Sequence, residues 1–262
     1  MYTDTHAHLD MLEDPVAALR RAGEADVGFV ATVVNVLEEP ERTFEQLEGW
    51  RIRAGVGGVS IPDVSIIVGT HPHDAAKTDV TAMKRIASYV CDERVVALGE
   101  LGLDYHYDHS PRDVQREVFA QQLTLAGEFN LPVCIHLREA HEDGLRILRE
   151  SGYPAERAIL HCFGLGYDAA EPFLELGCYV SFAGPISFRK SDMVRDAAVR
   201  VPLDRILSET DCPFLAPEPL RGKKNEPANV RYVAEVIVDA RPEPRDEVLH
   251  ALVKNARQLL TR

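Results

Sequence analysis

The segment LPVCIHLREAHEDGLRILRESGYPAERAILHC, residues 131–162, contains two short apolar runs separated by a helical stretch. The runs are Leu131 to His136 and Ala158 to Cys162, and each has a histidine at or beside its end. Apolar runs of this length that alternate with helices are typical of a parallel sheet, because the helix provides the crossover between two strands. The segment therefore predicts a strand–helix–strand unit with polar side chains at the strand ends.

Six further runs of the same kind occur elsewhere in the chain. They are Tyr2 to His8, Gly28 to Val34, Ser65 to Thr70, Arg94 to Glu100, Cys178 to Phe182 and Arg205 to Thr210. Eight strands that alternate with helices over 262 residues fit a closed barrel better than an open doubly wound sheet. We therefore expect an α/β fold in which residues 1–262 form a single (β/α)8 barrel domain of the TIM type.

Two connecting segments can be interpreted locally. Ser110 and Pro111 resemble an N-cap and a first-turn proline, and apolar residues then recur at helical spacing, at Val114, Val118, Phe119, Leu123 and Ala126. This predicts a helix that packs against the outside of the barrel. Residues 38–63 are less regular, with glycines at positions 55, 57 and 58, so we expect a helix and a loop there.

The charge and the cysteine content restrict the classes of partner and site. A net charge of −13 argues against broad binding to duplex DNA, since Lys and Arg supply most of the affinity for phosphates. Five widely spaced cysteines without a C-x-x-C pair predict reduced thiols. The chain starts without a basic leader or an apolar signal segment and has no run long enough to span a membrane, so we expect a cytoplasmic protein with no membrane partner.

The sequence Thr5-His6-Ala7-His8 places two imidazoles on one face of the first strand, because side chains alternate with a period of two. Both rings could then reach one metal ion. Asp4 lies one step deeper on that face and could orient His6 through a hydrogen bond. The alternative is a pair of hydrogen-bonded core histidines.

The run Val95 to Glu100 is apolar until its last residue, and an unpaired carboxylate is costly in a buried strand. Glu100 therefore needs a cation near it. A carboxylate has two oxygens and can bridge two metals, whereas a salt bridge to an Arg or Lys is the alternative.

Two more strands end in histidine, at His136 and at His161. The active sites of such barrels lie at the C-terminal ends of the strands, so these positions favour metal ligation over structural roles. Cys162 follows His161 and should point to the opposite face, so it is not expected to be a ligand.

The last strand ends with Glu209 and Asp211 on one face. Asp211 lies nearer the mouth of the barrel and is the expected metal ligand and water-orienting base, with Glu209 as a hydrogen-bond partner of a ligand histidine. An N-cap role of Asp211 in the following turn is compatible with ligation.

Seven motifs of the chain resemble those of the TatD-type metal-dependent deoxyribonucleases, a family of amidohydrolase-like barrels. In chain order they are DTHAHLD (4–10), GTHPH (69–73), GELGLDY (99–105), PVCIHLREA (132–140), LHCF (160–163), SETDCPFLAP (208–217) and RGKKNEPANV (221–230). The resemblance extends over nearly the whole chain. It departs from the usual pattern at Gly164-Leu165-Gly166, where a Ser-Gly pair is more common, and at Leu260, where an aromatic residue is usual.

The resemblance implies two metal sites that share Glu100. One site uses His6, His8, Glu100 and Asp211, and the other uses Glu100, His136 and His161. The resemblance also implies that His73 faces the substrate phosphate and that Arg138 lies near the site, while it assigns no role to Asp104 or Tyr105. For His71 and His73, packing around Pro72 is an equally weighted alternative.

These residues predict a hydrolase in which two divalent ions activate a water, with Glu100 and Asp211 as catalytic residues. Four imidazoles and two carboxylates suit Zn, Mn, Fe, Co or Ni better than Mg, although activity with added Mg is compatible with them.

The expected substrate is the phosphodiester backbone at single-stranded DNA ends, hydrolysed in the manner of a 3′–5′ exonuclease and without an obligate protein partner. The basic loop at residues 221–225 could contact phosphates, and bases could stack on rings that follow Glu100, at Tyr105, His106, Tyr107 and His109. A solvated turn and aromatic packing are the alternatives for these two features.

Two other functions compete with a deoxyribonuclease. The first is ester or amide hydrolysis on the same scaffold, for example of a D-aminoacyl-tRNA, because a barrel does not fix the substrate. The second is a non-enzymatic binding module stabilised by metal, for which a closed coordination shell is expected.

Overall fold

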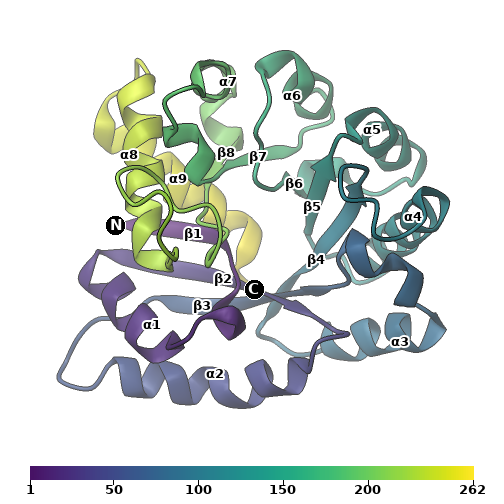
Figure 1. Cartoon of the computed structure of the whole chain (residues 1–262), viewed down its shortest axis with the longest axis horizontal. Coiled ribbons are helices and arrows are strands. Elements are labelled where there is room, and N and C mark those ends of the chain that lie inside the picture. The colour runs from purple at the N-terminus through teal and green to yellow at the C-terminus, as the bar shows by residue number, and fades with distance from the viewer.

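The computed structural model describes residues 1–262 and contains one sheet of eight parallel strands in the order β1 to β8 (Figure 1). Backbone contacts between His8 and Cys212 and between Asp211 and His6 bring the last strand against the first and nearly close the barrel. The predicted (β/α)8 fold is confirmed. The strands are β1 Tyr2–Ala7, β2 Val27–Asn35, β3 Asp63–Gly69, β4 Val95–Asp104, β5 Val133–Arg138, β6 Ala158–Leu160, β7 Tyr179–Phe182 and β8 Ile206–Ser208.

Helices surround the strands in Figure 1 and cover their outer faces. The large core cluster joins the outward side chains of the strands, such as Val30, Leu98 and Val180, to apolar helix faces. No helix combines the length and the apolar character needed to cross a membrane. The helices are α1 Pro15–Glu24, α2 Pro40–Ala54, α3 Val80–Tyr89, α4 Arg112–Glu128, α5 His141–Glu150, α6 Tyr167–Leu174, α7 Asp192–Arg200, α8 Val230–Ala240 and α9 Arg245–Leu260.

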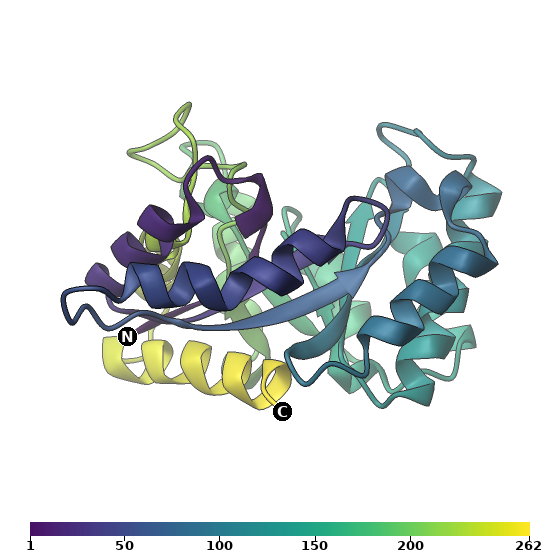
Figure 2. The same ribbon diagram turned by 90° about the horizontal axis from the view of Figure 1, so that it is seen from below.

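The inward side chains of the strands form a second apolar cluster that includes Phe29, Ile67 and Leu207. The end of α9 contributes Leu259 and Leu260 to this cluster, and Figure 2 shows the helix lying along one end of the molecule. Leu260 is fully buried there, so an aliphatic side chain fills this position without exposing the interior. The barrel is therefore packed at this end, and its other end is left for the functional site.

The predicted N-cap at Ser110 is wrong. Helix α4 begins at Arg112, and the capping position is taken by Pro111, which makes no side-chain cap. The Ser110 hydroxyl instead donates to the carbonyl of His73 at 2.7 Å and accepts from the amide of Ala76 at 3.0 Å. A tertiary contact has replaced the local cap, and it ties the loop after β4 to the loop after β3.

Several strand ends differ from the prediction. Strand β4 continues past Glu100 to Asp104, because it stays paired with β5 as far as the Asp104–Arg138 register. Strands β6 and β8 end earlier, so that His161 and Asp211 stand just beyond their last strand residues. Helix α2 and the loop after it agree with the expectation for residues 38–63.

Candidate metal centre

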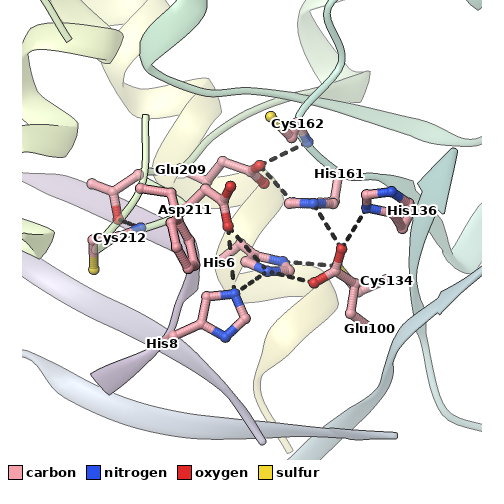
Figure 3. A network of polar contacts seen from close by, with 12 residues as sticks. His6, His8, Glu100, Cys134, His136, His161, Cys162, Glu209, Asp211 and Cys212 are labelled. Carbon is pink, nitrogen blue, oxygen red and sulfur yellow. Dashed lines mark hydrogen bonds and ion pairs between the residues drawn. The ribbon is translucent and has the colours of Figure 1, made fainter. Parts of the chain in front are cut away.

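Six side chains gather at the carboxyl ends of the strands, where β1, β4, β5, β6 and β8 meet (Figure 3). The sequence predicts that these residues converge, and the structure brings all of them together. They are His6, His8, Glu100, His136, His161 and Asp211.

Glu100 lies at the centre of this group. Its Oε2 is 3.4 Å from His6 Nε2, and its Oε1 is 2.7 Å from His136 Nδ1 and 3.1 Å from His161 Nε2. Burial opposes ionisation of the carboxyl, but the facing His161 and His71 hold its pKa well below the usual range. All ion-pair partners of Glu100 are histidines, so the alternative of a salt bridge to Arg or Lys does not apply.

His6, His8 and Asp211 form one side of the centre. The Nε2 atoms of the two rings are 3.3 Å apart, and Asp211 Oδ1 lies 3.4 Å from His8 Nε2 and 3.7 Å from His6 Nε2. Burial raises the pKa of the Asp211 carboxyl, but the hydrogen bond with His8 and the other nearby histidines outweigh it and lower that pKa. An ionised oxygen and two imidazole nitrogens therefore point at one space.

His161 and His136 form the other side, and each ring has a carboxylate at its second nitrogen. Glu209 Oε1 lies 2.8 Å from His161 Nδ1, which leaves Nε2 directed at Glu100. Asp104 Oδ2 lies 3.1 Å from His136 Nε2, which leaves Nδ1 directed at Glu100. Such pairs fix the tautomer and orientation of a metal-binding histidine.

The expected contact between Asp4 and the His6 ring is absent. The Asp4 carboxylate accepts from the Thr210 hydroxyl at 2.6 Å and from the backbone amides of Thr210 and His6. Burial raises the pKa of Asp4 to about 8 despite these bonds. Instead, the sulfur of Cys134 lies 3.2 Å from His6 Nδ1. Cys134 stands two residues before His136, so the same alternation could have identified it as inward-facing.

The sequence is compatible with both metal ligation and loop packing for His71, and the structure places this residue in the cluster. Its Nε2 is 3.5 Å from Glu100 Oε1, and the potential ligand atoms of His71, Glu100 and His136 lie within 4.8 Å of one another. The sets His6–His8–Glu100 and His6–Cys134–His161 meet the same criterion. The position of His71 beyond the end of β3 was the available sequence signal.

His73 and Arg138 both line the cavity above the cluster. His73 Nε2 is 3.0 Å from Asp104 Oδ2, so one carboxylate oxygen faces the rings of both His73 and His136. The Arg138 guanidinium lies over the ring of Tyr107, 4.6 Å from its centroid. The buried Asp104, to which the sequence assigned no role, thus connects the centre to the cavity wall.

The cavity has a volume of about 960 Å³, and Glu100, His161 and Asp211 are among the residues that line it. Of the four ring residues expected to stack with bases, only Tyr107 lines the cavity. Tyr105 points elsewhere and donates to Asp143 at 2.6 Å. The basic loop also lies outside the lining, where Lys224 pairs with Glu13 at 2.9 Å.

The chemistry of the potential ligand atoms indicates whether a metal ion can bind at this cluster. Four imidazoles and two carboxylates converge without a Lys or Arg among them, so only the histidines themselves or bound cations can balance the two negative charges. Imidazole and carboxylate donors suit first-row divalent metals. The residues therefore fit metal binding.

Comparison with known proteins identifies the family of the chain. The model of the family described as TatD related DNase matches residues 3–261. The chain is 37% identical to the metal-dependent hydrolase YabD of Bacillus subtilis, over 99% of this chain and 98% of that protein. It is 38% identical to YcfH of Escherichia coli, also a metal-dependent hydrolase, over 98% and 94% of the two chains.

A solved structure shares the architecture. The crystal structure of YjjV, a TatD homologue from Escherichia coli, superposes with a TM-score of 0.88 at 28% identity, and the match covers 99% of this chain and 97% of that one. Fold, clustered donors and family relatives agree, and the chain belongs to the TatD-related DNase family of metal-dependent hydrolases.

Proposed function

We propose that this hydrolase cleaves phosphodiester bonds at the ends of single-stranded DNA, using two divalent cations. The observation that carries the proposal is the position of Glu100, whose two oxygens face different groups of histidines. A carboxylate so placed suits a bridge between two ions. The family model, described as a TatD related DNase, supports the substrate class.

In this proposal His6, His8, Glu100 and Asp211 hold one cation, and Glu100, His136 and His161 hold the other. Two bound cations would supply Lewis acid chemistry, in which a water is acidified and negative charge on the phosphoryl group is neutralised. Glu209 and Asp104 keep the rings of His161 and His136 in the required orientation.

Asp211 orients the attacking water and accepts its proton. The nearby histidines favour its ionised form, and its Oδ1 lies beside His8 at the base of the cavity. A general base must be ionised and within hydrogen-bond reach of the proton that it removes. His73, across the centre on the cavity wall, contacts the phosphate, with its ring held by Asp104.

A substrate panel tests the reaction class. Protein loaded in turn with zinc, manganese, cobalt, nickel, iron and magnesium is assayed on labelled single-stranded DNA, duplex DNA and D-aminoacyl-tRNA. We expect shortening of the single strand to be the fastest reaction, and elemental analysis to find about two metal ions per chain. Deacylation of the tRNA without cleavage of DNA would refute the proposal.

The variant His136→Ala removes one metal-facing nitrogen. We expect at least about a hundredfold loss of DNA hydrolysis, more than the 10–100-fold typical of losing an outer hydrogen-bond partner. The matched control is His250→Ala, an exposed histidine on α9, which should keep wild-type activity. Normal hydrolysis by folded His136→Ala protein would contradict the assignment.

A further inference from the structure

Exposed apolar side chains are concentrated around the candidate centre. Of the eleven large hydrophobic residues that are exposed, five line the cavity: Met11, Tyr107, Leu165, Phe214 and Leu215. Tyr107 and Phe214 are each 51% exposed. Apolar groups that remain exposed together at a cavity mark a surface that contacts a ligand.

The two exposed aromatic rings flank the metal-binding cluster at different points. The Phe214 ring is 6.1 Å from the ring of His8, and the Tyr107 ring is 5.5 Å from the ring of His73. Both contacts are edge-on. The Tyr107 ring is also stacked with the ring of His109 at 5.5 Å and lies under the Arg138 guanidinium, so a ligand would contact the part of Tyr107 that stays exposed.

The strand order places these rings on opposite sides of the centre. Phe214 belongs to the loop after β8, and Tyr107 belongs to the loop after β4. In a nearly closed barrel of eight strands in sequential order, β4 and β8 lie across from each other. A phosphate held at the centre would therefore have one aromatic side chain on each side.

The charges of the cavity indicate what the walls can bind. The lining contains a single Arg or Lys, Arg138, which lies over Tyr107. Additional phosphates would meet repulsion there rather than counter-charges. The lining carboxylates are Asp10, Glu38, Asp74, Glu100, Asp104, Glu139 and Asp211.

We propose that Phe214 and Tyr107 are the contact surfaces for the two organic groups of a phosphodiester, one on each side of the metal centre. This inference rests on the proposed function and deepens it. The preferred substrate is then a diester with a ring-bearing group on both sides, such as the last linkage of a strand, rather than a phosphomonoester. Contact with the exposed parts of aromatic side chains tolerates any base, so the site needs no base-specific hydrogen bonds.

The test compares Tyr107→Ala and Phe214→Ala on two small diesters. Bis(p-nitrophenyl) phosphate has a ring on both sides, whereas methyl p-nitrophenyl phosphate has a ring only on its leaving group. The matched control is Phe129→Ala, which removes an exposed ring at the end of α4, outside the cavity. Manganese-loaded protein is used throughout.

With bis(p-nitrophenyl) phosphate, we expect each variant to raise KM about tenfold, equivalent to about 1.4 kcal/mol, with little change in kcat. The double variant should raise KM about a hundredfold, because distant sites contribute additively. With methyl p-nitrophenyl phosphate, only the variant on the leaving-group side should raise KM. The control should match the wild type on both substrates.

Turnover with an unchanged KM in both variants would overturn the inference and leave the phosphodiesterase function intact. Equal effects of both variants on the methyl ester would also overturn it, because the two rings would then contact the same group. If the wild type hydrolyses no diester, binding of dithymidine phosphate is measured by equilibrium dialysis. Binding weakened about tenfold by each variant would then retain the inference and refute the hydrolytic function, whereas no binding would refute both.

Discussion

Asp104 is buried, and all its carboxylate contacts are directed at the site or at the loop beside it. Oδ1 accepts from the amides of His106 and Tyr107 at 3.0 and 2.9 Å, while Oδ2 faces His73 and His136. Burial opposes ionisation of Asp104, but these contacts hold its pKa well below the usual value. The Asp104 carboxylate thereby orients both the ring of His136, an expected metal ligand, and the ring of His73, which is expected to contact the phosphate.

The variant Asp104→Asn keeps an acceptor for the two amides but turns an NH2 group towards the two rings. We expect hydrolysis to fall about 10- to 100-fold and metal content to fall with it, because His136 loses the partner that fixes its tautomer. Turnover and elemental analysis of the same preparation measure both effects. Asp108→Asn, an exposed position in the same loop, should change neither. Unchanged metal content and turnover in Asp104→Asn would exclude this orienting role.

At the scale of single elements, α2 and α3 are joined by a surface cluster around Glu41. Its carboxylate pairs with the Arg85 guanidinium and accepts a hydrogen bond from the Tyr89 hydroxyl at 2.7 Å. The Arg85 side chain, with a smaller contribution from Tyr89, lowers the pKa of Glu41 to about 2. Half of the carboxylate side chain remains in contact with solvent, so the pair adds little to stability.

Because the folded-state pKa of Glu41 lies below its unfolded value, its stabilisation is present above about pH 4.5 and is lost as the pH falls towards 2. We expect Glu41→Gln to lower the unfolding free energy at pH 7 by about 0.5 kcal/mol, and never by more than about 1 kcal/mol. Urea unfolding at pH 7 and at pH 3 measures the difference, which should shrink at the lower pH. The control is Glu45→Gln, one turn further along α2, because Glu45 has no ion-pair partner. If Glu41→Gln lost more unfolding free energy at pH 3 than at pH 7, stabilisation by the ionised Glu41 carboxylate would be refuted.

At the scale of the whole molecule, the candidate centre joins strands from all parts of the barrel. Residues of β1, β4, β5 and the segments after β6 and β8 meet there, so a ligand bound to them stabilises the closed barrel as a unit. Anything that binds only the folded state raises the unfolding temperature.

We therefore expect chelation to lower the thermal midpoint and metal to restore it. Free metal at a hundred times its dissociation constant adds about 2.7 kcal/mol, which corresponds to about 5–10 °C for a chain of this size. Calorimetry across a metal titration measures the shift. His161→Ala should lose most of the rise in thermal midpoint that metal produces, and His250→Ala should keep that rise. Identical midpoints with chelator and with metal would show that the cluster binds no cation.

The sequence by itself determined the barrel and the six converging donors. Both follow from local rules: apolar runs alternating with helices predict parallel strands, and the period of two tells which side chains share a face. His6, His8, Glu100, His136, His161 and Asp211 could be named because each stands at or near the end of such a run, and strand ends meet in a barrel.

The tertiary structure decided which partners those donors have and what surrounds them. Local spacing could not show that Cys134 faces His6 or that Asp104 serves two histidines, since these contacts depend on the register between different strands. Local spacing also misassigned Ser110 as an N-cap, whereas its hydroxyl donates to the carbonyl of His73 in another loop. The opposition of Tyr107 and Phe214 arises only when β4 and β8 close into one ring, because residues more than a hundred positions apart then share a cavity.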